Sequence, residues 1–201
     1  MSLSTDFVIR TGAFDHTGKV PASFEDSTKT ALDRYRKARR GAGGDAERLI
    51  TGSDDFTMFL WEPEKSTKPL ARLTGHQKLI NHVSFSPDGR FIASASFDNS
   101  VKLWDGRDGK YVDLISMLNG RFIASLRGHV APVYQCSWSS DSRLLVSSSK
   151  DTTLKVWDIK TRKLKHDLPG HDDEVYAVDW SPDGQLVASG GKDKKVRLFG
   201  F

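Results

Sequence analysis

The chain of 201 residues repeats one arrangement of residues three times. Each copy begins with a Gly-His pair and continues through two runs of alternating apolar residues to a turn around an Asp. The pairs are Gly75-His76, Gly128-His129 and Gly170-His171. In each copy a Ser lies four residues before that Asp and an aromatic residue six residues after it, and a copy without the Gly-His pair precedes the three. Self-similarity of this period indicates a repeat architecture, in which each unit buries its apolar face against a neighbour.

The recurring polar residues form one set per repeat. The sets are His76, Ser94, Asp98 and Trp104; His129, Ser147, Asp151 and Trp157; His171, Ser189, Asp193 and Phe199; and, without a histidine, Thr51, Asp55 and Trp61. A Ser, a His and an Asp together resemble a nucleophilic triad, but a hydrolase needs one such set beside a pocket and an oxyanion hole. Because this set recurs in every repeat with an aromatic partner, we predict a structural hydrogen-bond network in each unit.

In this network the Asp is expected to bond the His, the His to bond the Ser or Thr, and the indole N–H to complete the chain of bonds. Two departures follow from the residue types. Phe199 has no N–H, so the last network is predicted to be one donor short and more prone to fraying. Asp55 has no histidine before it and needs another partner or a water.

The apolar pattern within each repeat predicts short antiparallel strands. In the first full copy, residues 80–86, 90–96 and 101–105 alternate with a period of two and are separated by the turn sequences SPDG and FDNS. A fourth, weaker run leads to the next Gly-His pair. Four short strands in a repeat of about 40–45 residues predict the blade of a β-propeller. Residues 8–11 are expected to form a strand of the first blade.

The expected fold is therefore all-β, a propeller of about four blades in an open arc, with one α-helix inserted in the first blade. The expected units are an incomplete first blade at 1–73 with the helical insertion at about 15–46, a second blade at 74–127 with a loop extension at about 112–123, a third at 128–169, and a fourth at 170–201 that lacks its outer strand. The extension is inferred because the step from Gly75 to Gly128 is 53 residues and that from Gly128 to Gly170 is 42. A lengthened loop before the outer strand and an error in the gene model both account for it.

One helix is predicted over residues 25–41, EDSTKTALDRYRKARRG. Asp26 or Ser27 is a suitable N-cap, basic residues fill the last turns, and Gly41 ends the helix. Its few apolar residues share one narrow stripe, as expected for a helix that packs on one side only.

Several functional classes are disfavoured by the composition. The six histidines lack the spacing of metal ligands, and the single cysteine, Cys136, sits in a predicted strand, where a buried inert thiol is expected. No Gly-rich phosphate loop is followed by Lys-Ser/Thr, and no apolar run is long enough to span a bilayer. A net charge of +4 is too small to indicate nucleic-acid binding by itself. We therefore predict a chain that is not an enzyme and has no cofactor, no metal, no small-molecule substrate and no membrane contact.

The register of the Gly-His pairs, the Asp turns and the dipeptides Trp104-Asp105 and Trp157-Asp158 resembles that of the WD40 proteins. More specific stretches, among them RTGAFDHTGK, SDDFTMFLWEP and DLPGHDDEVYAVDWSPDGQLVASGGKDK, resemble the C-terminal part of the Notchless family. The resemblance implies a scaffold for biogenesis of the large (60S) ribosomal subunit in the nucleolus and nucleus, docked on ribosomal RNA and assembly factors of the pre-60S particle. It also implies that a midasin-type AAA+ ATPase is reached only through a ubiquitin-like domain, which we do not expect among these residues. The alternative is a generic WD40 adaptor, such as a substrate receptor or a signalling scaffold.

The WD40 resemblance further implies one binding face, lined by three positions per blade. They are the third and fifth residues after the histidine of the Gly-His pair and the residue before the turn Asp: Asp54, Leu79, Asn81, Phe97, Pro132, Tyr134, Lys150, Glu174, Tyr176 and Lys192. Aromatic and lysine side chains there suit protein hot spots, or stacking and phosphate contacts with RNA. The simpler interpretation is that these side chains pack at the rim of the propeller or carry ordinary solvated charge. Of this set, Tyr134 and Tyr176 are the strongest candidates.

The basic helix is a second candidate surface, for ribosomal RNA. Its basic residues are Lys29, Arg34, Arg36, Lys37, Arg39 and Arg40. A charged helix face is more often simply solvated, but a contact with RNA would weaken steeply with added salt.

Overall fold

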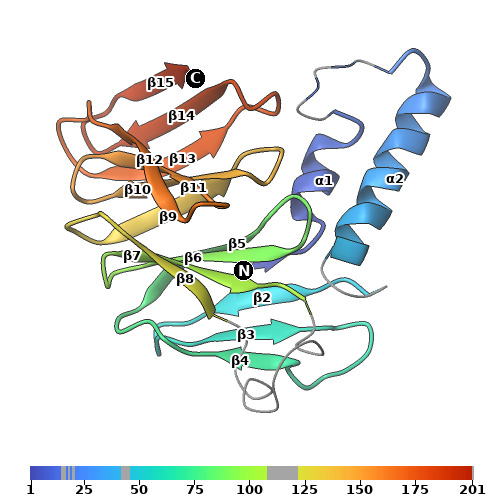
Figure 1. Ribbon diagram of the computed structural model, residues 1–201, viewed down its shortest axis with the longest axis horizontal. Coiled ribbons are helices and arrows are strands. Elements are labelled where there is room, and N and C mark those ends of the chain that lie inside the picture. The colour runs from blue at the N-terminus through green and yellow to red at the C-terminus, as the bar shows by residue number, and fades with distance from the viewer. Residues whose placement is uncertain (15–16, 18, 20, 42–45, 108–121, 201) are drawn as a thin grey trace.

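The computed structural model describes residues 1–14, 17, 19, 21–41, 46–107 and 122–200. Four antiparallel sheets lie side by side as successive blades, from the first sheet at the bottom of Figure 1 to the fourth at the top, with two helices at one side. This confirms the predicted all-β open propeller with a helical insertion. The predicted loop extension at 112–123 falls mostly outside the described residues.

The sheets follow the chain in order, each with its first strand innermost. The first contains β1 (Ser2–Leu3), β2 (Leu49–Gly52), β3 (Met58–Trp61) and β4 (Ala71–Leu73). The second contains β5 (Ile80–Phe85), β6 (Phe91–Ser96), β7 (Ser100–Asp105) and β8 (Phe122–Arg127). The third contains β9 (Val133–Trp138), β10 (Leu144–Ser149), β11 (Leu154–Asp158) and β12 (Lys163–Leu168). The fourth, over the described residues, contains β13 (Val175–Trp180), β14 (Leu186–Gly191) and β15 (Val196–Gly200).

The start of the chain differs from the sequence prediction. The strand expected at residues 8–11 is wrong, because helix α1 (Asp6–Thr11) occupies that segment. The innermost strand of the first blade is instead β1, whose Ser2 and Leu3 pair with Ile50 and Leu49. Since β1 already occupies that edge of β2, the following residues have no sheet partner there and satisfy their backbone groups as a helix.

The predicted basic helix is present as α2 (Phe24–Gly41). Its N-cap is neither Asp26 nor Ser27, as predicted, but Ser23. The Ser23 Oγ accepts a hydrogen bond from the backbone N–H of Asp26 at 3.1 Å and donates one to the Asp26 carboxylate at 2.8 Å. Asp26 therefore stands three residues after the cap, where an acidic side chain also interacts favourably with the positive end of the helix dipole.

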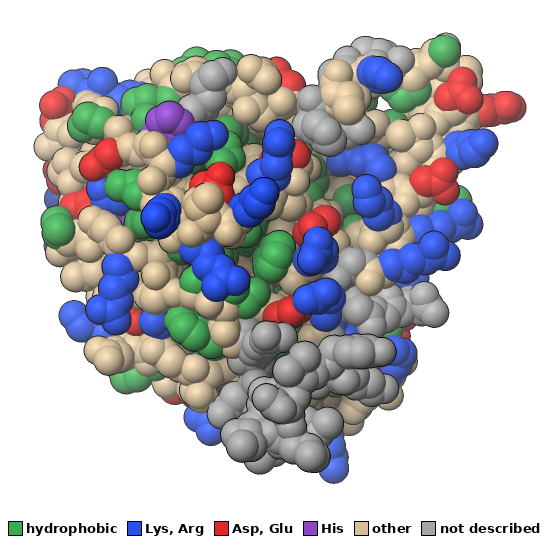
Figure 2. Space-filling view, in the orientation of Figure 1, with side chains coloured by type: hydrophobic (Ala, Val, Ile, Leu, Met, Phe, Trp, Pro, Cys, Tyr) green, Lys and Arg blue, Asp and Glu red, His purple; other side chains and the backbone are tan. Residues whose placement is uncertain are grey.

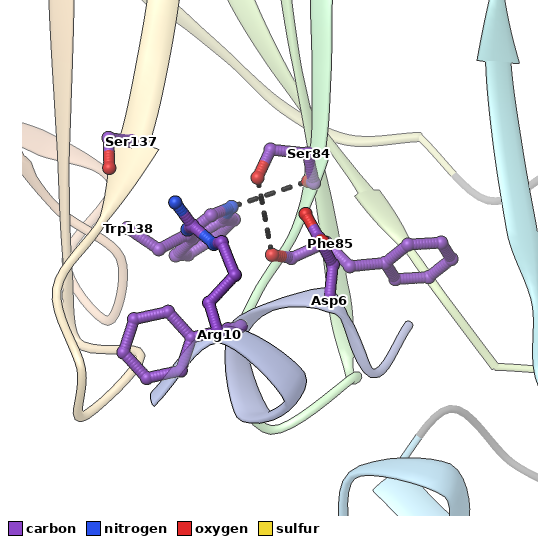
Figure 3. A pocket seen from close by; sticks show the side chains of 7 residues that line it. Asp6, Arg10, Ser84, Phe85, Ser137 and Trp138 are labelled. Carbon is purple, nitrogen blue, oxygen red and sulfur yellow. Dashed lines mark hydrogen bonds between the residues drawn. The ribbon is translucent and has the colours of Figure 1, made fainter. Parts of the chain in front are cut away.

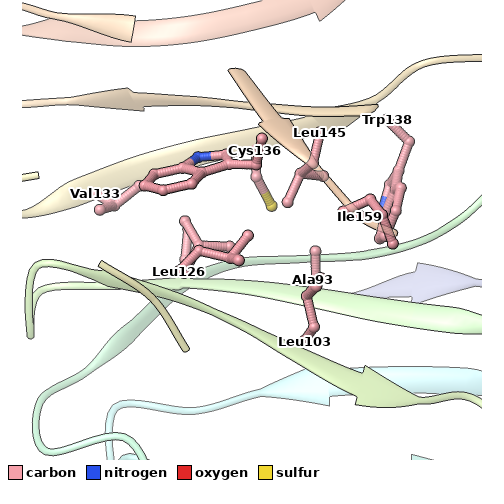
Figure 4. Packing of buried hydrophobic residues seen from close by; sticks show 11 residues of the cluster. Ala93, Leu103, Leu126, Val133, Cys136, Trp138, Leu145 and Ile159 are labelled. Carbon is pink, nitrogen blue, oxygen red and sulfur yellow. The ribbon is translucent and has the colours of Figure 1, made fainter. Parts of the chain in front are cut away.

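The apolar core lies between the blades. Figure 4 shows the contact of the second and third blades, where Ala93, Leu103 and Leu126 pack against Trp138 and Leu145, all at most 3% exposed. Two similar clusters join the first blade to the second and the third to the fourth. Full burial of one such large side chain contributes about 1.5–3 kcal/mol, so these three clusters hold the arc together.

Cys136 lies in the core between the second and third blades. It is 1% exposed, and burial raises the pKa of its thiol to about 12. The structure therefore contains a buried thiol at the predicted strand position, in a form that resists ionisation.

Helix α1 lies against the innermost strands of the blades. Asp6 and Arg10 line a cavity of about 20 Å³ together with Ser84 and Phe85 of β5 and Trp138 of β9 (Figure 3). The Trp138 indole donates a hydrogen bond to the Ser84 carbonyl at 3.3 Å, across the boundary between the two blades. Among the described residues, no helix is both long and apolar enough to span a bilayer.

Candidate functional site

The second blade brings its predicted polar set together. His76 bonds the Asp98 carboxylate through Nδ1 at 2.7 Å and the Ser94 Oγ through Nε2 at 2.7 Å. The Trp104 indole donates to the same Ser94 Oγ at 2.9 Å. Ser94 is fully buried and Trp104 is 1% exposed, so this chain of bonds lies inside the blade.

The third and fourth blades repeat the arrangement. In the third, His129 lies 2.8 Å from both Asp151 and Ser147, and the Trp157 indole donates to Ser147 at 2.8 Å. In the fourth, His171 lies 2.9 Å from Asp193 and 2.8 Å from Ser189. Phe199 has no N–H to donate and is only partly buried.

The first blade retains part of the arrangement. The Trp61 indole donates to the Thr51 hydroxyl at 3.0 Å. Asp55 accepts hydrogen bonds from the backbone N–H and the hydroxyl of Thr57, at 3.0 and 2.7 Å. Ser100 makes the same two bonds to Asp98 in the second blade, so they belong to the turn and do not replace the histidine.

In the second, third and fourth blades the turn Asp also positions the loop that precedes its blade. The Asp98 carboxylate accepts the backbone N–H groups of Gln77 and Ser100, both at 3.1 Å. Burial raises the pKa of Asp98, but the hydrogen bonds from His76 and Ser100 outweigh it and hold that pKa well below its ordinary value. Burial also raises the pKa of Asp193, but the hydrogen bond with His171 outweighs it and the pKa falls to about 2. These carboxylates are therefore ionised at neutral pH.

The polar sets place the predicted binding positions next to one another. The residue before each turn Asp donates its backbone N–H to the carbonyl of the third residue after the histidine. These bonds join Phe97 to Leu79 at 3.1 Å, Lys150 to Pro132 at 2.9 Å and Lys192 to Glu174 at 2.8 Å. Two of the three predicted positions in each of these blades thus share one hydrogen bond.

Three aromatic side chains connect the second, third and fourth blades on this face. The rings of Phe97 and Tyr134 lie 5.8 Å apart at 76°, and those of Tyr134 and Tyr176 lie 5.2 Å apart at 63°. Such edge-on pairs are favourable beyond the area they bury. We call Phe97, Tyr134 and Tyr176 the aromatic cluster. Tyr176 is 46% exposed.

Charged residues surround the aromatic cluster. The Tyr134 hydroxyl donates to the Glu174 carboxylate at 2.6 Å, and burial together with this bond raises the pKa of Tyr134 to about 12. Glu174 also lies 3.4 Å from the Lys150 ammonium and 3.7 Å from that of Lys192. Lys192 lies 3.6 Å from the Asp173 carboxylate as well, and both lysine side chains remain half exposed to solvent.

The other predicted face residues lie at its margin. The exposed Asn81 donates its side-chain amide to the Val133 carbonyl at 3.2 Å, and so bridges the second and third blades. Asp54 is exposed in the turn between β2 and β3 and takes part in none of the contacts that join the aromatic cluster.

The basic residues of α2 divide into two groups. Arg34 points back to α1, where its guanidinium donates to the carbonyls of Gly12 and Phe14, and Arg39 pairs with Glu64 of the first blade at 3.0 Å. The other four remain exposed along the helix; they are Lys29, Arg36, Lys37 and Arg40. Figure 2 shows Lys and Arg side chains gathered on this side of the molecule.

A cleft of about 420 Å³ separates the helices from the turns of the second and third blades. Arg34 and Lys37 line it on the helix side, and Asp88, Ser142 and Arg143 line it on the blade side. Sequence reasoning missed this cleft because its walls come from segments far apart in the chain. The basic pattern of the helix gave no sign of what lies opposite.

A family model supplies the relationship to known proteins. The CAF1B/HIR1 beta-propeller domain matches residues 29–201, most of the chain. The chain belongs to this β-propeller family. The match covers the second, third and fourth blades in full, and with them every residue of the aromatic cluster.

Individual proteins that are similar to this β-propeller define its relationship more narrowly than the family does. Ribosome assembly protein 4 of Saccharomyces cerevisiae is 65% identical over 112 residues, which is 56% of this chain and 22% of that protein. The Notchless protein homolog of Arabidopsis thaliana is 60% identical over 119 residues, 59% of this chain and 22% of that protein. WD repeat-containing protein 1 of Xenopus tropicalis is 40% identical over 114 residues, 56% of this chain and 17% of that protein. These matches confirm the resemblance to the Notchless family. The chain spans less than a quarter of the length of each of these relatives.

Proposed function

We propose that this β-propeller is a non-catalytic scaffold in the biogenesis of the large (60S) ribosomal subunit, docked on ribosomal RNA and assembly factors of the pre-60S particle. The observation that carries the proposal is the 65% identity to a protein named Ribosome assembly protein 4. The proposed location is accordingly the nucleolus and nucleus. The generic WD40 adaptor has weaker support. WD repeat-containing protein 1, whose name gives only its repeats, is 40% identical, compared with 65% for Ribosome assembly protein 4.

The aromatic cluster is the proposed docking site for protein. Its three rings come from three blades, and the bond from Tyr134 to Glu174 fixes the central ring. A rigid aromatic surface loses little conformational entropy on binding, and Tyr is enriched among residues that dominate interface energies. Lys150 and Lys192 at its margin suit an acidic partner or a phosphate group.

Helix α2 is the proposed contact for ribosomal RNA. The four exposed basic residues are free of the intramolecular role that Arg34 has, and they follow one another along an accessible helix. A contact of this kind neutralises phosphates and releases counterions, so its affinity falls steeply with salt. Arg34 and Arg39, which were predicted in the same set, contribute instead to the packing of the helix.

The buried polar sets support the absence of catalysis. The Ser94 and Ser147 hydroxyls are fully buried, and each accepts an indole N–H as well as facing a histidine. A nucleophile must reach a substrate carbonyl beside oxyanion donors, which a side chain enclosed between strands cannot do. We propose that contact with a midasin-type ATPase requires a ubiquitin-like domain and does not involve the residues that the structure describes.

The proposal is tested by co-sedimentation of the tagged protein with pre-60S particles. Tyr134→Ala with Tyr176→Ala should raise the Kd for the particle at least tenfold, since loss of two anchoring rings costs more than about 1.4 kcal/mol. Leu164→Ala, a 42% exposed apolar residue on β12, is the matched control and should bind normally. Unchanged binding of the double variant would refute the docking site.

Salt and RNase separate the two proposed contacts. Binding through α2 should fall with added salt and with RNase, whereas binding through the aromatic cluster should persist. If the protein does not sediment with pre-60S particles at any salt concentration, the function itself is wrong.

A further inference from the structure

The cleft beside helix α2 is walled by segments from the interior of the chain. Helix α2, inserted between β1 and β2 (Figure 1), contributes Lys37 to one wall. The turn between β5 and β6 contributes Asp88 to the other wall, and the turn between β9 and β10 contributes Ser142 and Arg143. Its volume of about 420 Å³ lies within the range of ligand sites in proteins. The cleft can therefore admit a group of a partner molecule.

The turn of the third blade at this cleft differs in sequence from the same turn in its two neighbours. The second and fourth blades have Ser-Pro-Asp-Gly there, and the third has Ser-Ser-Asp-Ser at 139–142. Gly89 and Gly184 both have a φ of 73°, and Ser142 keeps nearly the same conformation with a φ of 61°. Glycine adopts this left-handed conformation readily, whereas a serine is strained in it. Backbone strain of this kind is typical of functional sites.

The two serines that replace Pro and Gly bring hydroxyl groups to the cleft, which both residues line. Ser142 is 9% exposed, and its Oγ accepts the backbone N–H of Asp88 at 3.1 Å. Its own O–H is donated to no residue that the structure describes. The Ser140 Oγ is enclosed and has no hydrogen-bond partner within the described ranges. Since buried polar groups are nearly always hydrogen-bonded, both hydroxyls point to an acceptor supplied by a ligand.

Two cations lie at the same cleft. Lys37 is exposed on α2 and has no ion pair with any part of the chain that the structure describes. Arg143 donates through Nε to the Asp141 carboxylate at 2.5 Å. The Arg143 side chain is nevertheless 80% exposed, so the outer edge of its guanidinium is open to a second acceptor. A guanidinium fork and an ammonium are the groups that proteins commonly use to bind phosphate.

The carboxylates on the blade side of the cleft are engaged by their own turns. Asp88 accepts the Ser86 hydroxyl at 2.6 Å and the backbone N–H of Arg90 at 3.1 Å. Asp141 accepts the Ser139 hydroxyl at 2.7 Å and is paired with Arg143. The groups that remain to meet a ligand are therefore hydroxyl donors and cations, a set that suits an anion.

The cations continue beyond the cleft along α2. Lys37 and Arg40 are three residues apart, which makes them neighbours on the helix surface, and both are exposed. A single small anion would use only the groups inside the cleft. An anion with regularly repeated charges would use both the cleft and the helix, and the phosphate backbone of an RNA strand is such an anion.

We propose that the cleft holds one backbone phosphate of a single-stranded RNA that runs along α2. Ser142 donates its hydroxyl to this phosphate, and Lys37 and Arg143 pair with its charge from opposite walls. The inference rests on the RNA contact proposed above for α2 and adds an anchoring site to it. Contacts with phosphate carry no sequence information, so binding at the cleft should depend little on the sequence of the RNA.

Fluorescence anisotropy of a short labelled single-stranded RNA, titrated with the full chain at several salt concentrations, tests the proposal. Ser142→Gly should raise the Kd about tenfold, because it removes one hydrogen bond to a charged group. The dependence of the Kd on salt should stay unchanged, since no charge is removed. Glycine suits the φ of 61° and occupies this position in the neighbouring blades, so the turn should be retained, which circular dichroism checks.

Arg143→Gln tests the charge of the site. It should raise the Kd and make the plot of log K against log salt shallower by about 0.7, the effect of one lost phosphate contact on a single strand. Arg90→Gln is the matched control, because Arg90 follows the turn of the second blade in the same register and does not line the cleft. It should leave both the Kd and the salt dependence as in the wild type.

The outcomes separate this site from the proposed function. A wild type that binds no RNA would overturn the contact of α2 and this inference with it. RNA binding that Lys37→Ala with Arg40→Ala weakens, but that Ser142→Gly and Arg143→Gln leave unchanged, would overturn the cleft alone. Tighter binding of a phosphoserine peptide than of RNA, lost in Ser142→Gly, would make a phosphorylated protein the occupant and overturn the assignment to RNA.

Discussion

The indole nitrogen of Trp157 donates a hydrogen bond to the hydroxyl of Ser147 across 2.8 Å, with both side chains at most 1% exposed. This bond distinguishes the polar set of a blade from a catalytic triad. It occupies the serine oxygen with a fixed donor, and it does so in the dry interior of the sheet. The role of the set is therefore best tested through stability.

Trp157→Phe should lower the free energy of unfolding by about 1–2 kcal/mol, because it removes one buried hydrogen bond and a little apolar area. Urea denaturation measures the change. Ser147→Ala combined with Trp157→Phe is the control, and its loss should be smaller than the sum of the two single losses, since the same bond is removed in both. Strict additivity would contradict a direct Ser147–Trp157 bond.

Phe199→Trp should have the opposite effect. Ser189 lies 2.8 Å from His171 but has no indole donor, so a tryptophan at position 199 would supply the N–H that the other blades use. We expect a gain of about 1 kcal/mol in the free energy of unfolding. In a Ser189→Ala background the hydrogen-bond acceptor is absent and this gain should disappear. A gain that survives there would come from packing instead.

His82 should make stability depend on pH below neutrality. Burial lowers the pKa of His82 from its ordinary 6.5 to about 4, an effect that the chain's N-terminal ammonium strengthens and that Asp179 and Asp6 oppose. Between these two pH values the unfolded chain binds a proton that the folded chain does not. The free energy of unfolding should therefore be level above pH 6.5 and fall by roughly 3 kcal/mol on acidification to pH 4.

Urea denaturation across this pH range, repeated with His82→Asn, checks the assignment. The variant should lose the slope between pH 6.5 and pH 4, while His166→Asn, at an exposed histidine of β12, should keep it. The turn carboxylates Asp98, Asp151 and Asp193 have lowered pKa values, so their contribution is lost only below about pH 4. A slope that survives in His82→Asn would show that another group titrates.

Arg34→Ala should loosen the helices without removing an RNA contact. The guanidinium joins α2 to the carbonyls of Gly12 and Phe14, so its loss should speed amide hydrogen exchange in α1. Lys37→Ala together with Arg40→Ala should leave exchange unchanged and reduce the salt-dependent part of particle binding. If Arg34→Ala reduces RNA binding while leaving exchange in α1 unchanged, the two groups of basic residues have been assigned the wrong way round.

The strands and the polar sets could be predicted from the sequence because their signals are local. Alternation with a period of two places residues on one face of a strand, and a fixed offset between His76, Ser94 and Asp98 returns in every full blade. The strand predicted at residues 8–11 was wrong because a local pattern was the only signal available for that segment. A short stretch of mixed pattern suits a strand or a helix, and the choice depended on whether β2 still had a free edge.

Contacts between distant segments lay beyond sequence reasoning. Arg48 is fully buried, donates to the Gly106 carbonyl of the second blade at 2.7 Å, and pairs with Glu62 at 3.3 Å. A basic residue before a strand gives no sign of such a link. The bond from Tyr134 to Glu174 joins two blades in the same way.

The sequence by itself determined the repeat, the order of the strands within each full blade, and the residues that meet inside it, because backbone alternation and tight turns act over a few residues. Only the tertiary structure decided which face of each blade is covered. Val156 and Leu198 occupy equivalent positions in the third and fourth blades and carry similar apolar side chains, yet the first is fully buried and the second is 68% exposed. Val156 is buried because the fourth blade packs on it, and a residue's own side chain does not specify which segment packs against it.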